Sequence, residues 1–295
     1  MSQEYTVDSP NVTFLDPKVI VFHNVIQDCD GLIDYYEENA SWRGWYGFGR
    51  QVEARGPSVQ GRETFPTWEE WKSDVIDGYD NPITEEEIPY RTNVASAFYW
   101  ATKFYVEQTN LVLPNWYTQT WCLARYIPDE NLINNEDLTM NFHTDYQVND
   151  SESPGEKFGM TAVFYPNDDY EGGEIAFKVA KDGKVVKEFE YKPKAGDVVI
   201  FPANFPYYHA VRRVWGAPKY IIRLYWSYKF EGTEAWFELQ KKYGEEKFRE
   251  LEAERVRDGS LMYTVPYLYP KFTLSEYYEH LENGTLQEAK EKTYG

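Results

Sequence analysis

Cysteine, histidine and positive charge are all scarce in this chain of 295 residues. It has 2 Cys and 4 His, and its 30 Lys and Arg face 49 Asp and Glu, for a net charge of −19. Cys29 and Cys122 are far apart, which excludes a disulfide framework and suits a reducing compartment. The negative charge opposes binding to nucleic acid and to anionic membrane surfaces, so we expect neither as a partner.

Long apolar runs are missing as well. No segment approaches the roughly 20 apolar residues that cross a bilayer. The N-terminal sequence MSQEYTVDSPN is polar and lacks the apolar stretch of a signal peptide. We therefore expect a cytoplasmic protein.

Aromatic residues are abundant, with 26 Tyr, 17 Phe and 10 Trp within a hydrophobic content of 42%. This composition indicates a folded globular protein and suits β-sheet faces and a walled pocket. We predict a single domain over residues 1–295, with an N-terminal strand and helical support in 1–114. The β core then spans 115–230, and a C-terminal helical extension spans 231–295.

The central segment has the pattern of an all-β core. Short runs of β-branched and aromatic residues alternate with turn signals such as NDDYEGG and KDG. The predicted strands are 116–127, 140–148, 159–166, 172–180, 185–193, 196–203, 206–215 and 219–228. Eight short strands in sequence predict a mainly β fold with flanking helices, built on a double-stranded β-helix (jelly-roll, cupin-like) core.

Within this core, the stretch NFHTDY places His143 two residues before Asp145. Residues i and i+2 of an extended strand point to the same side, so the imidazole and the carboxylate are expected side by side. His209, after the apolar strand GDVVIFP, is the third ligand that would complete a two-histidine, one-carboxylate facial triad. Such a triad leaves adjacent coordination positions open on a non-haem Fe(II) ion.

An H-x-D tripeptide alone is weak evidence for a metal site, because it occurs by chance in many chains. The β-rich context of both histidines strengthens the interpretation. The other two, His23 and His280, fall outside the β core, and we interpret them as structural or surface residues.

Two cations occur on the last predicted strand, KYIIRLYW. By alternation Lys219 and Arg223 share one face with Ile221 and Tyr225. A cation inside a barrel is costly unless it is paired with an anion. Each is therefore either part of an internal salt bridge or a site for a ligand carboxylate, and the pattern does not choose between them.

Four stretches together resemble a known family. They are NFHTDY, MTAVFYPNDDYEGGEIAF, KPKAGDVVIFP and HAVRRVWGAPKYIIRLYW. In this order they are similar to the H-x-D strand, the following hairpin, the strand before the distal histidine and the closing strand of the Fe(II)/2-oxoglutarate-dependent oxygenases. The resemblance is to the prolyl 4-hydroxylase-like branch and covers about residues 115–228.

The resemblance implies a role for each matching residue. His143, Asp145 and His209 would be the catalytic iron ligands. Lys219 would bind the C5 carboxylate of 2-oxoglutarate, with Arg223 as a rival on the same face, and Tyr126 would help to hold the co-substrate. Gly216 comes one place early relative to the family pattern, which leaves the register at Lys219 open. Because Asp145 is intact, a halogenase is not expected.

The implied activity is that of a 2-oxoglutarate-dependent dioxygenase that hydroxylates an unactivated C–H bond and releases succinate and CO2. Its cofactors would be Fe(II), 2-oxoglutarate and O2, with ascorbate allowed. The substrate would be a small molecule or peptide, with a prolyl or other amino acid side chain favoured. A homodimer is compatible with the charged C-terminal helices.

Two alternatives stay open at this point. One is a cupin-type metalloenzyme that does not use 2-oxoglutarate, which leaves Lys219 and Arg223 unexplained. The other is a non-catalytic jelly-roll binding protein, which leaves the ordered set of His143, Asp145 and His209 unexplained. Outside the β core, the aromatic stretch SWRGWYGFGR (41–50) fits either a substrate lid or a packed loop.

Overall fold

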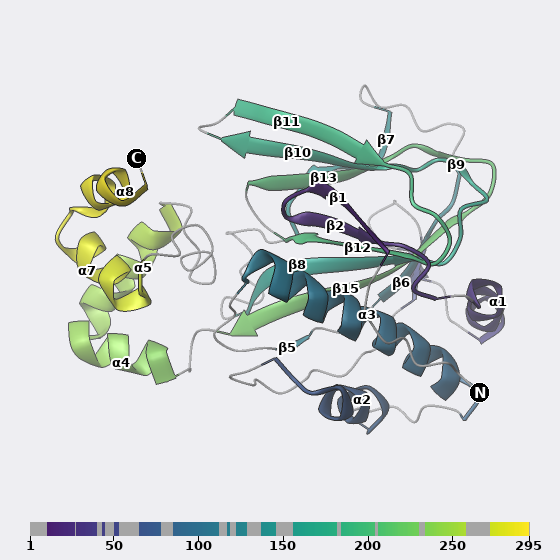
Figure 1. The fold of residues 1–295 in the computed structure, drawn as a ribbon, viewed down its shortest axis with the longest axis horizontal. Coiled ribbons are helices and arrows are strands. Elements are labelled where there is room, and N and C mark those ends of the chain that lie inside the picture. The colour runs from purple at the N-terminus through teal and green to yellow at the C-terminus, as the bar shows by residue number, and fades with distance from the viewer. Residues whose placement is uncertain are drawn as a thin grey trace.

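Two stacked β-sheets form the centre of the protein, as Figure 1 shows. The structure is a computed structural model. It describes residues 11–26, 28–39, 43–44, 50–52, 65–77, 85–111, 117–118, 122–128, 137–145, 156–181, 184–203, 206–229, 234–257 and 272–294.

The larger sheet contains nine strands among these residues. In spatial order they are β1 (Val12–Asp16), β2 (Val19–Phe22), β12 (Asp197–Pro202), β8 (Glu156–Tyr165), β15 (Lys219–Lys229), β6 (Cys122–Tyr126), β4 (Arg50–Val52) and β3 (Arg43–Gly44), with β5 (Tyr117–Thr118) paired to β15. All the pairings in this sheet are antiparallel.

The smaller sheet faces it and contains four strands in the described part of the chain. Their order is β11 (Lys184–Tyr191), β10 (Ile175–Lys181), β13 (Tyr207–Arg212) and β7 (Leu138–His143). A separate two-stranded ladder joins β9 (Glu171–Gly172) to β14 (Val214–Trp215).

The chain path between the sheets defines the fold. It runs from β6 in the larger sheet to β7 in the smaller, back to β8, on to β10 and β11, then to β12, β13 and β15 in alternation. This is the path of a double-stranded β-helix, so the predicted fold class is confirmed.

Alternating side chains divide the interior into two cores. On β8, Val163 and Tyr165 point between the sheets, whereas Ala162 and Phe164 point to the opposite face, where the helices pack. All six residues of β12 are buried, because this strand is covered on both faces.

The helical support lies on the outer face of the larger sheet. The long helix α3 (Ile88–Thr109) packs on β12 and β8, and α2 (Trp68–Asp77) packs on α3, as both views show. Pro89 occupies the first turn of α3, and Asn110 ends the helix with φ of 51°. The helix α1 (Cys29–Asn39) follows β2.

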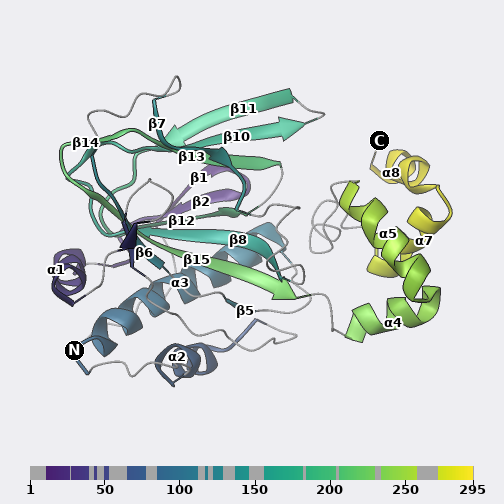
Figure 2. The ribbon, with the colours of Figure 1, turned by 180° about the vertical axis from the view of Figure 1, so that it is seen from behind.

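The C-terminal helices form a group beside the two sheets (Figures 1 and 2). They are α4 (Glu234–Tyr243), α5 (Glu245–Arg257), α7 (Leu274–Glu282) and α8 (Leu286–Tyr294). α5 packs on α4 and α7, and α7 packs on α8. The division of the chain into one domain with the predicted boundaries stays a prediction.

Several predicted elements differ from the structure in extent. The predicted helical support in 1–114 also contains the short strands β3 and β4, and β4 extends the larger sheet beyond β6. The predicted strand 206–215 divides into β13 and β14, because Arg213 leaves the ladder between them. The aromatic residues of the suggested lid, Trp42, Trp45 and Tyr46, lie outside the described residues.

No described helix combines the length and apolar character needed to span a membrane.

Candidate active site

The cross-strand register of β7 and β13 sets the direction of the His143 side chain. Met140 pairs with Val211, and His143 pairs with His209, so three steps along β7 match two along β13. This extra residue is a β-bulge, which shifts the inside–outside alternation by one position. Met140 and His143 therefore both face the space between the sheets, although strict alternation would turn one of them out.

The structure corrects the predicted reason for the pairing of His143 with Asp145. We predicted a strand over 140–148 that would hold both residues on one face. The strand ends at His143, and Asp145 lies in the bend that follows. The carboxylate therefore reaches the imidazole through the bend and not through strand alternation.

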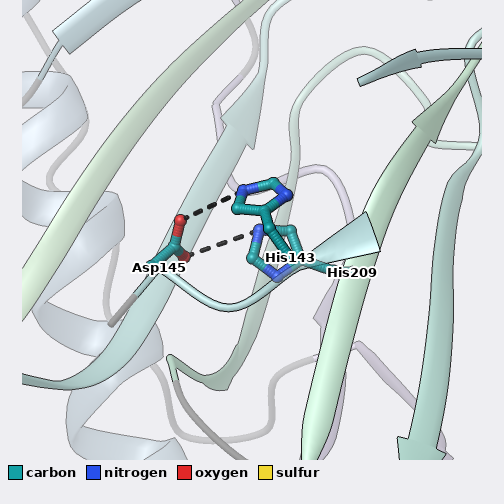
Figure 3. A group of neighbouring side chains, drawn as sticks. All are labelled: His143, Asp145 and His209. Atoms are coloured by element: carbon teal, nitrogen blue, oxygen red, sulfur yellow. Dashed lines mark ion pairs between the residues drawn. The ribbon is translucent and has the colours of Figure 1, made fainter. Parts of the chain in front are cut away.

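The three predicted ligands meet at one place between the sheets, as Figure 3 shows. The Asp145 carboxylate faces both imidazoles from one side, with Oδ1 3.6 Å from His143 Nε2 and Oδ2 3.5 Å from His209 Nε2. One ligand atom from each residue lies within 4.8 Å of the other two. Two imidazole nitrogens and one carboxylate oxygen are donors that suit a divalent iron ion, so the residues present fit that metal.

Two hydroxyl groups hold the Asp145 carboxylate. Thr161 on β8 donates a hydrogen bond of 2.6 Å to Oδ2, and Tyr225 on β15 donates one of 3.2 Å to Oδ1. Burial by itself acts to raise the pKa of Asp145, but the two imidazoles and Thr161 hold that pKa well below its usual range. The carboxylate is thus ionised and oriented before any metal binds.

The two histidines have different surroundings. The His143 Nδ1 lies 2.8 Å from the Asn141 carbonyl oxygen, so it donates there and leaves Nε2 as the ligand atom. The His209 side chain is buried against Phe201, and burial lowers its pKa to about 4. At neutral pH His209 is therefore uncharged, which is the form that binds metals.

A cavity opens from this cluster between the sheets. Its empty volume is about 420 Å³ including the mouth, a size in the range of small-molecule sites. Its lining comprises Tyr126, Met140, His143, Asp145, Thr161, Val163, Tyr165, Ile175, His209, Val211, Lys219, Ile221, Arg223 and Tyr225. All six residues that we predicted for the site are in this set.

Lys219 lies at one end of β15 in a wall of tyrosine rings. Its side chain is 1% exposed, and its Nζ lies 5.0 Å from the ring centre of Tyr165 and 5.5 Å from that of Tyr170. The Nζ donates a hydrogen bond of 2.5 Å to the Gly173 carbonyl oxygen. Burial, assisted by the nearby Lys192, lowers the pKa of Lys219 to about 7.

Tyr126 and Arg223 occupy other parts of the same wall. Tyr126 on β6 is the cross-strand partner of Lys219, and its ring centre lies 6.0 Å from the lysine Nζ. Arg223 is four residues further along β15, opposite Val163 of β8. The alternation that we predicted for the last strand is confirmed, since positions 219, 221, 223 and 225 all line the cavity.

Sequence reasoning assigned no role to Thr161, Tyr225 or Lys192. Thr161 is a polar residue in the otherwise apolar strand MTAVFY, which is a signal that alternation could have used. Lys192 donates hydrogen bonds to the carbonyl oxygens of Tyr170 and Gly172, and only the three-dimensional structure brings it near Lys219.

A comparison with protein families finds one match, to the 2OG-Fe(II) oxygenase superfamily over residues 131–227. The matched segment includes the three clustered ligands and both cavity cations. Through this segment the chain is similar to the 2OG-Fe(II) oxygenase superfamily. The expectation of a 2-oxoglutarate-dependent dioxygenase is confirmed at this level, and the family implies Fe(II) and 2-oxoglutarate as cofactors.

A comparison with solved structures finds proteins of low identity to this chain. A 2OG-Fe(II) oxygenase family protein from Burkholderia pseudomallei has 12% sequence identity and a TM-score of 0.43, covering 71% of this chain and 84% of that chain. A prolyl hydroxylase from Trichoplax adhaerens, in complex with a hypoxia inducible factor peptide fragment, has 12% identity and a TM-score of 0.42, covering 71% and 83%. A prolyl-4-hydroxylase from Pseudomonas putida has 14% identity and a TM-score of 0.39, covering 71% and 91%.

These identities and scores are too low to transfer a substrate from those proteins to this oxygenase. A comparison with curated protein sequences finds no match.

Proposed function

We propose that this oxygenase hydroxylates a C–H bond of a small molecule or peptide, using Fe(II), 2-oxoglutarate and O2. One oxygen atom of O2 would enter the substrate as a hydroxyl group. The other would enter succinate, which forms with CO2 from 2-oxoglutarate. The observation that supports this most directly is the meeting of His143, Asp145 and His209 at one end of a cavity that also contains a buried lysine.

In this proposal the three clustered residues are the iron ligands. Bound iron would supply the oxidative decarboxylation of 2-oxoglutarate and the activation of O2. The protein would supply the geometry. Thr161 and Tyr225 would keep the Asp145 carboxylate in place, and the Asn141 carbonyl would keep the His143 ring in its ligating tautomer.

We assign the C5 carboxylate of 2-oxoglutarate to Lys219. The residue is buried and lies away from the ligand cluster, among tyrosine rings that exclude water from the cavity wall. Its Nζ now donates to the Gly173 carbonyl oxygen, which a carboxylate would replace or supplement as acceptor. Tyr126, directly across from Lys219 in the ladder, would pack against the co-substrate chain.

The oxidised molecule belongs to the class of peptides or small molecules, with an amino acid side chain, prolyl included, as the favoured target. Ascorbate would serve to keep the iron reduced. The predictions of a cytoplasmic location, of a homodimer and of no nucleic acid partner remain predictions.

The direct test is turnover of 2-oxoglutarate by metal-loaded protein in air. We expect Fe(II)-dependent formation of equal amounts of succinate and CO2, lost in His143→Ala and in Asp145→Ala. His280→Ala serves as the control, because His280 is half-buried among the C-terminal helices, where it hydrogen-bonds to Thr285, and it does not line the cavity. Bound iron without any consumption of 2-oxoglutarate would favour the cupin alternative, and absence of metal binding would favour the non-catalytic one.

A further inference from the structure

The cavity contains two cations, although the co-substrate assignment uses only one. Lys219 and Arg223 both line it from the inward face of β15. The four-residue separation places their Cα atoms about 13 Å apart along the strand. Among the described residues that line the cavity, Asp145 is the only carboxylate. The cavity therefore contains one cation beyond the one assigned to 2-oxoglutarate.

The two cations are in different electrostatic neighbourhoods. The pKa of Lys219 responds first to burial and then to Lys192 and Glu174, which lie at its end of the cavity. Arg223 instead lies two residues before Tyr225 on β15, and its cross-strand partner Val163 lies two residues after Thr161, so it is near the two hydroxyls that bond to Asp145. Lys219 is thus at the far end of the cavity, whereas Arg223 is at the metal end.

A second contact supports the position of Arg223. Its guanidinium carbon lies 5.3 Å from the ring centre of Tyr225, and the hydroxyl of that ring donates to the Asp145 carboxylate. Arg223 is half-buried, so a ligand in the cavity can reach it while water is partly excluded. A planar guanidinium in such a place binds a carboxylate with two parallel hydrogen bonds, which a lysine does not do.

We infer that Arg223 is a substrate-binding residue that holds a carboxylate of the molecule to be oxidised, next to the metal. This inference rests on the proposed function and makes its substrate class narrower. A residue inside a peptide chain has lost its α-carboxylate and offers a carboxylate only where it is Asp, Glu or the C-terminus, whereas every free amino acid or other small carboxylic acid presents one. The expected substrate is therefore a small free acid, with the free L-amino acids as the first set to test.

The experiment measures two affinities in the full-length protein. The first is the affinity of the Fe(II)-loaded protein for 2-oxoglutarate, followed without oxygen by the visible charge-transfer band. The second is the affinity of protein loaded with redox-stable Mn(II) and 2-oxoglutarate for the twenty L-amino acids. Each amino acid is titrated by calorimetry as the free acid and as its amide, and succinate release is measured for those that bind to the Fe(II) form.

We expect at least one free acid to bind and to stimulate succinate release, while its amide binds at least tenfold more weakly. Arg223→Gln should weaken binding of that acid by about 10- to 100-fold, the loss expected for charge-assisted hydrogen bonds, and Arg223→Lys should restore part of it. Lys219→Met should show the opposite pattern, with 2-oxoglutarate affected more than the acid. Arg212→Gln is the matched control, because Arg212 on β13 pairs with Glu190 outside the cavity.

Three results would overturn the inference while leaving the proposed function intact. They are equal binding of acid and amide, a larger loss of 2-oxoglutarate than of acid in Arg223→Gln, and no binding of any free acid by a wild-type protein that binds 2-oxoglutarate. A wild-type protein that shows no charge-transfer band at all would overturn the proposed function, and the inference with it.

Discussion

His143 on β7 and His209 on β13 are direct cross-strand partners, and their ring centroids lie 4.3 Å apart. The two histidines of the site are thus held by the hydrogen-bonded ladder of one sheet. Asp145 lies in the bend after β7, and its carboxylate accepts hydrogen bonds from the hydroxyl groups of Thr161 and Tyr225 in the other sheet. The ligand cluster therefore connects the two sheets, and its geometry depends on how they pack.

A metal that binds this cluster should stabilise the fold. We expect Mn(II) to raise the melting temperature, with a gain of about 2.7 kcal/mol when the free metal is at 100 times its Kd. EDTA should reverse the shift, and His143→Ala should abolish it. The control His280→Ala should retain it. A shift of the same size in His143→Ala would show that the metal binds elsewhere.

The hydrogen bond from Thr161 to Asp145 should contribute to metal affinity. Thr161→Val keeps the shape of the side chain and removes the donor, so we expect metal affinity to fall about tenfold or more. Thr102→Val is the matched control, because it removes a buried hydroxyl that accepts from Trp226 on the far side of the larger sheet. Titration with Mn(II) should separate the two variants even where both lower the melting temperature. Equal metal affinities would contradict the role of Thr161.

Binding of 2-oxoglutarate should weaken as pH rises through neutrality. Burial and the nearby charge of Lys192 lower the pKa of Lys219 to about 7, although Glu174 acts in the opposite direction. Above this pH the amine is neutral and must take up a proton to hold a carboxylate. The Kd should therefore rise by up to about tenfold per pH unit above pH 7 and level off below it.

The measurement is the 2-oxoglutarate Kd between pH 6 and 9, with proton uptake followed by calorimetry in buffers of different ionisation enthalpy. Lys219→Arg should remove the rise, because an arginine stays charged throughout this range. A rise of the same slope in Lys219→Arg would assign the pH dependence to another group.

Gly173 should control access to Lys219. Its φ is +67°, and a Cβ there would lie 2.7 Å from the Tyr170 ring and 3.2 Å from Lys219 Cδ. Gly173→Ala should therefore weaken 2-oxoglutarate binding severalfold. Gly284→Ala is the matched control, because φ there is +66° and a Cβ meets nothing within 4 Å. Both variants should lose about 1–2 kcal/mol of stability from the left-handed backbone, but only Gly173→Ala should affect the co-substrate. Equal affinity of the two variants for 2-oxoglutarate would contradict a role of Gly173 in co-substrate binding.

Much of this site could be predicted because it depends on strand alternation. The period of two on β15 correctly assigned positions 219, 221, 223 and 225 to one face, and the structure places them all on the cavity. The same rule failed between His143 and Asp145, because the strand ends at His143 and a bulge precedes it. A bulge is defined by how two strands pair, so the sequence of the bulged strand alone does not reveal it.

Other parts of the site depend on contacts between distant segments. Thr161 in the larger sheet donates a hydrogen bond to Asp145, which follows a strand of the smaller sheet. Lys192 and Lys219 donate to carbonyl groups of the same short segment, residues 170–173. The strand β4 in the larger sheet likewise pairs with a distant segment, Val52 with Leu123 and Arg50 with Arg125. Such pairings follow from the packing of the double-stranded β-helix, which no local pattern specifies.

We propose that His143, Asp145 and His209 bind iron in a cavity where Lys219 holds 2-oxoglutarate. The most direct measurement is an anaerobic titration of metal-free protein with Fe(II) and then 2-oxoglutarate, followed by visible absorption. We expect a weak charge-transfer band that is absent in His143→Ala and that needs much more 2-oxoglutarate in Lys219→Met. Iron binding with no band at any 2-oxoglutarate concentration would contradict it, and so would a band that persists in His143→Ala.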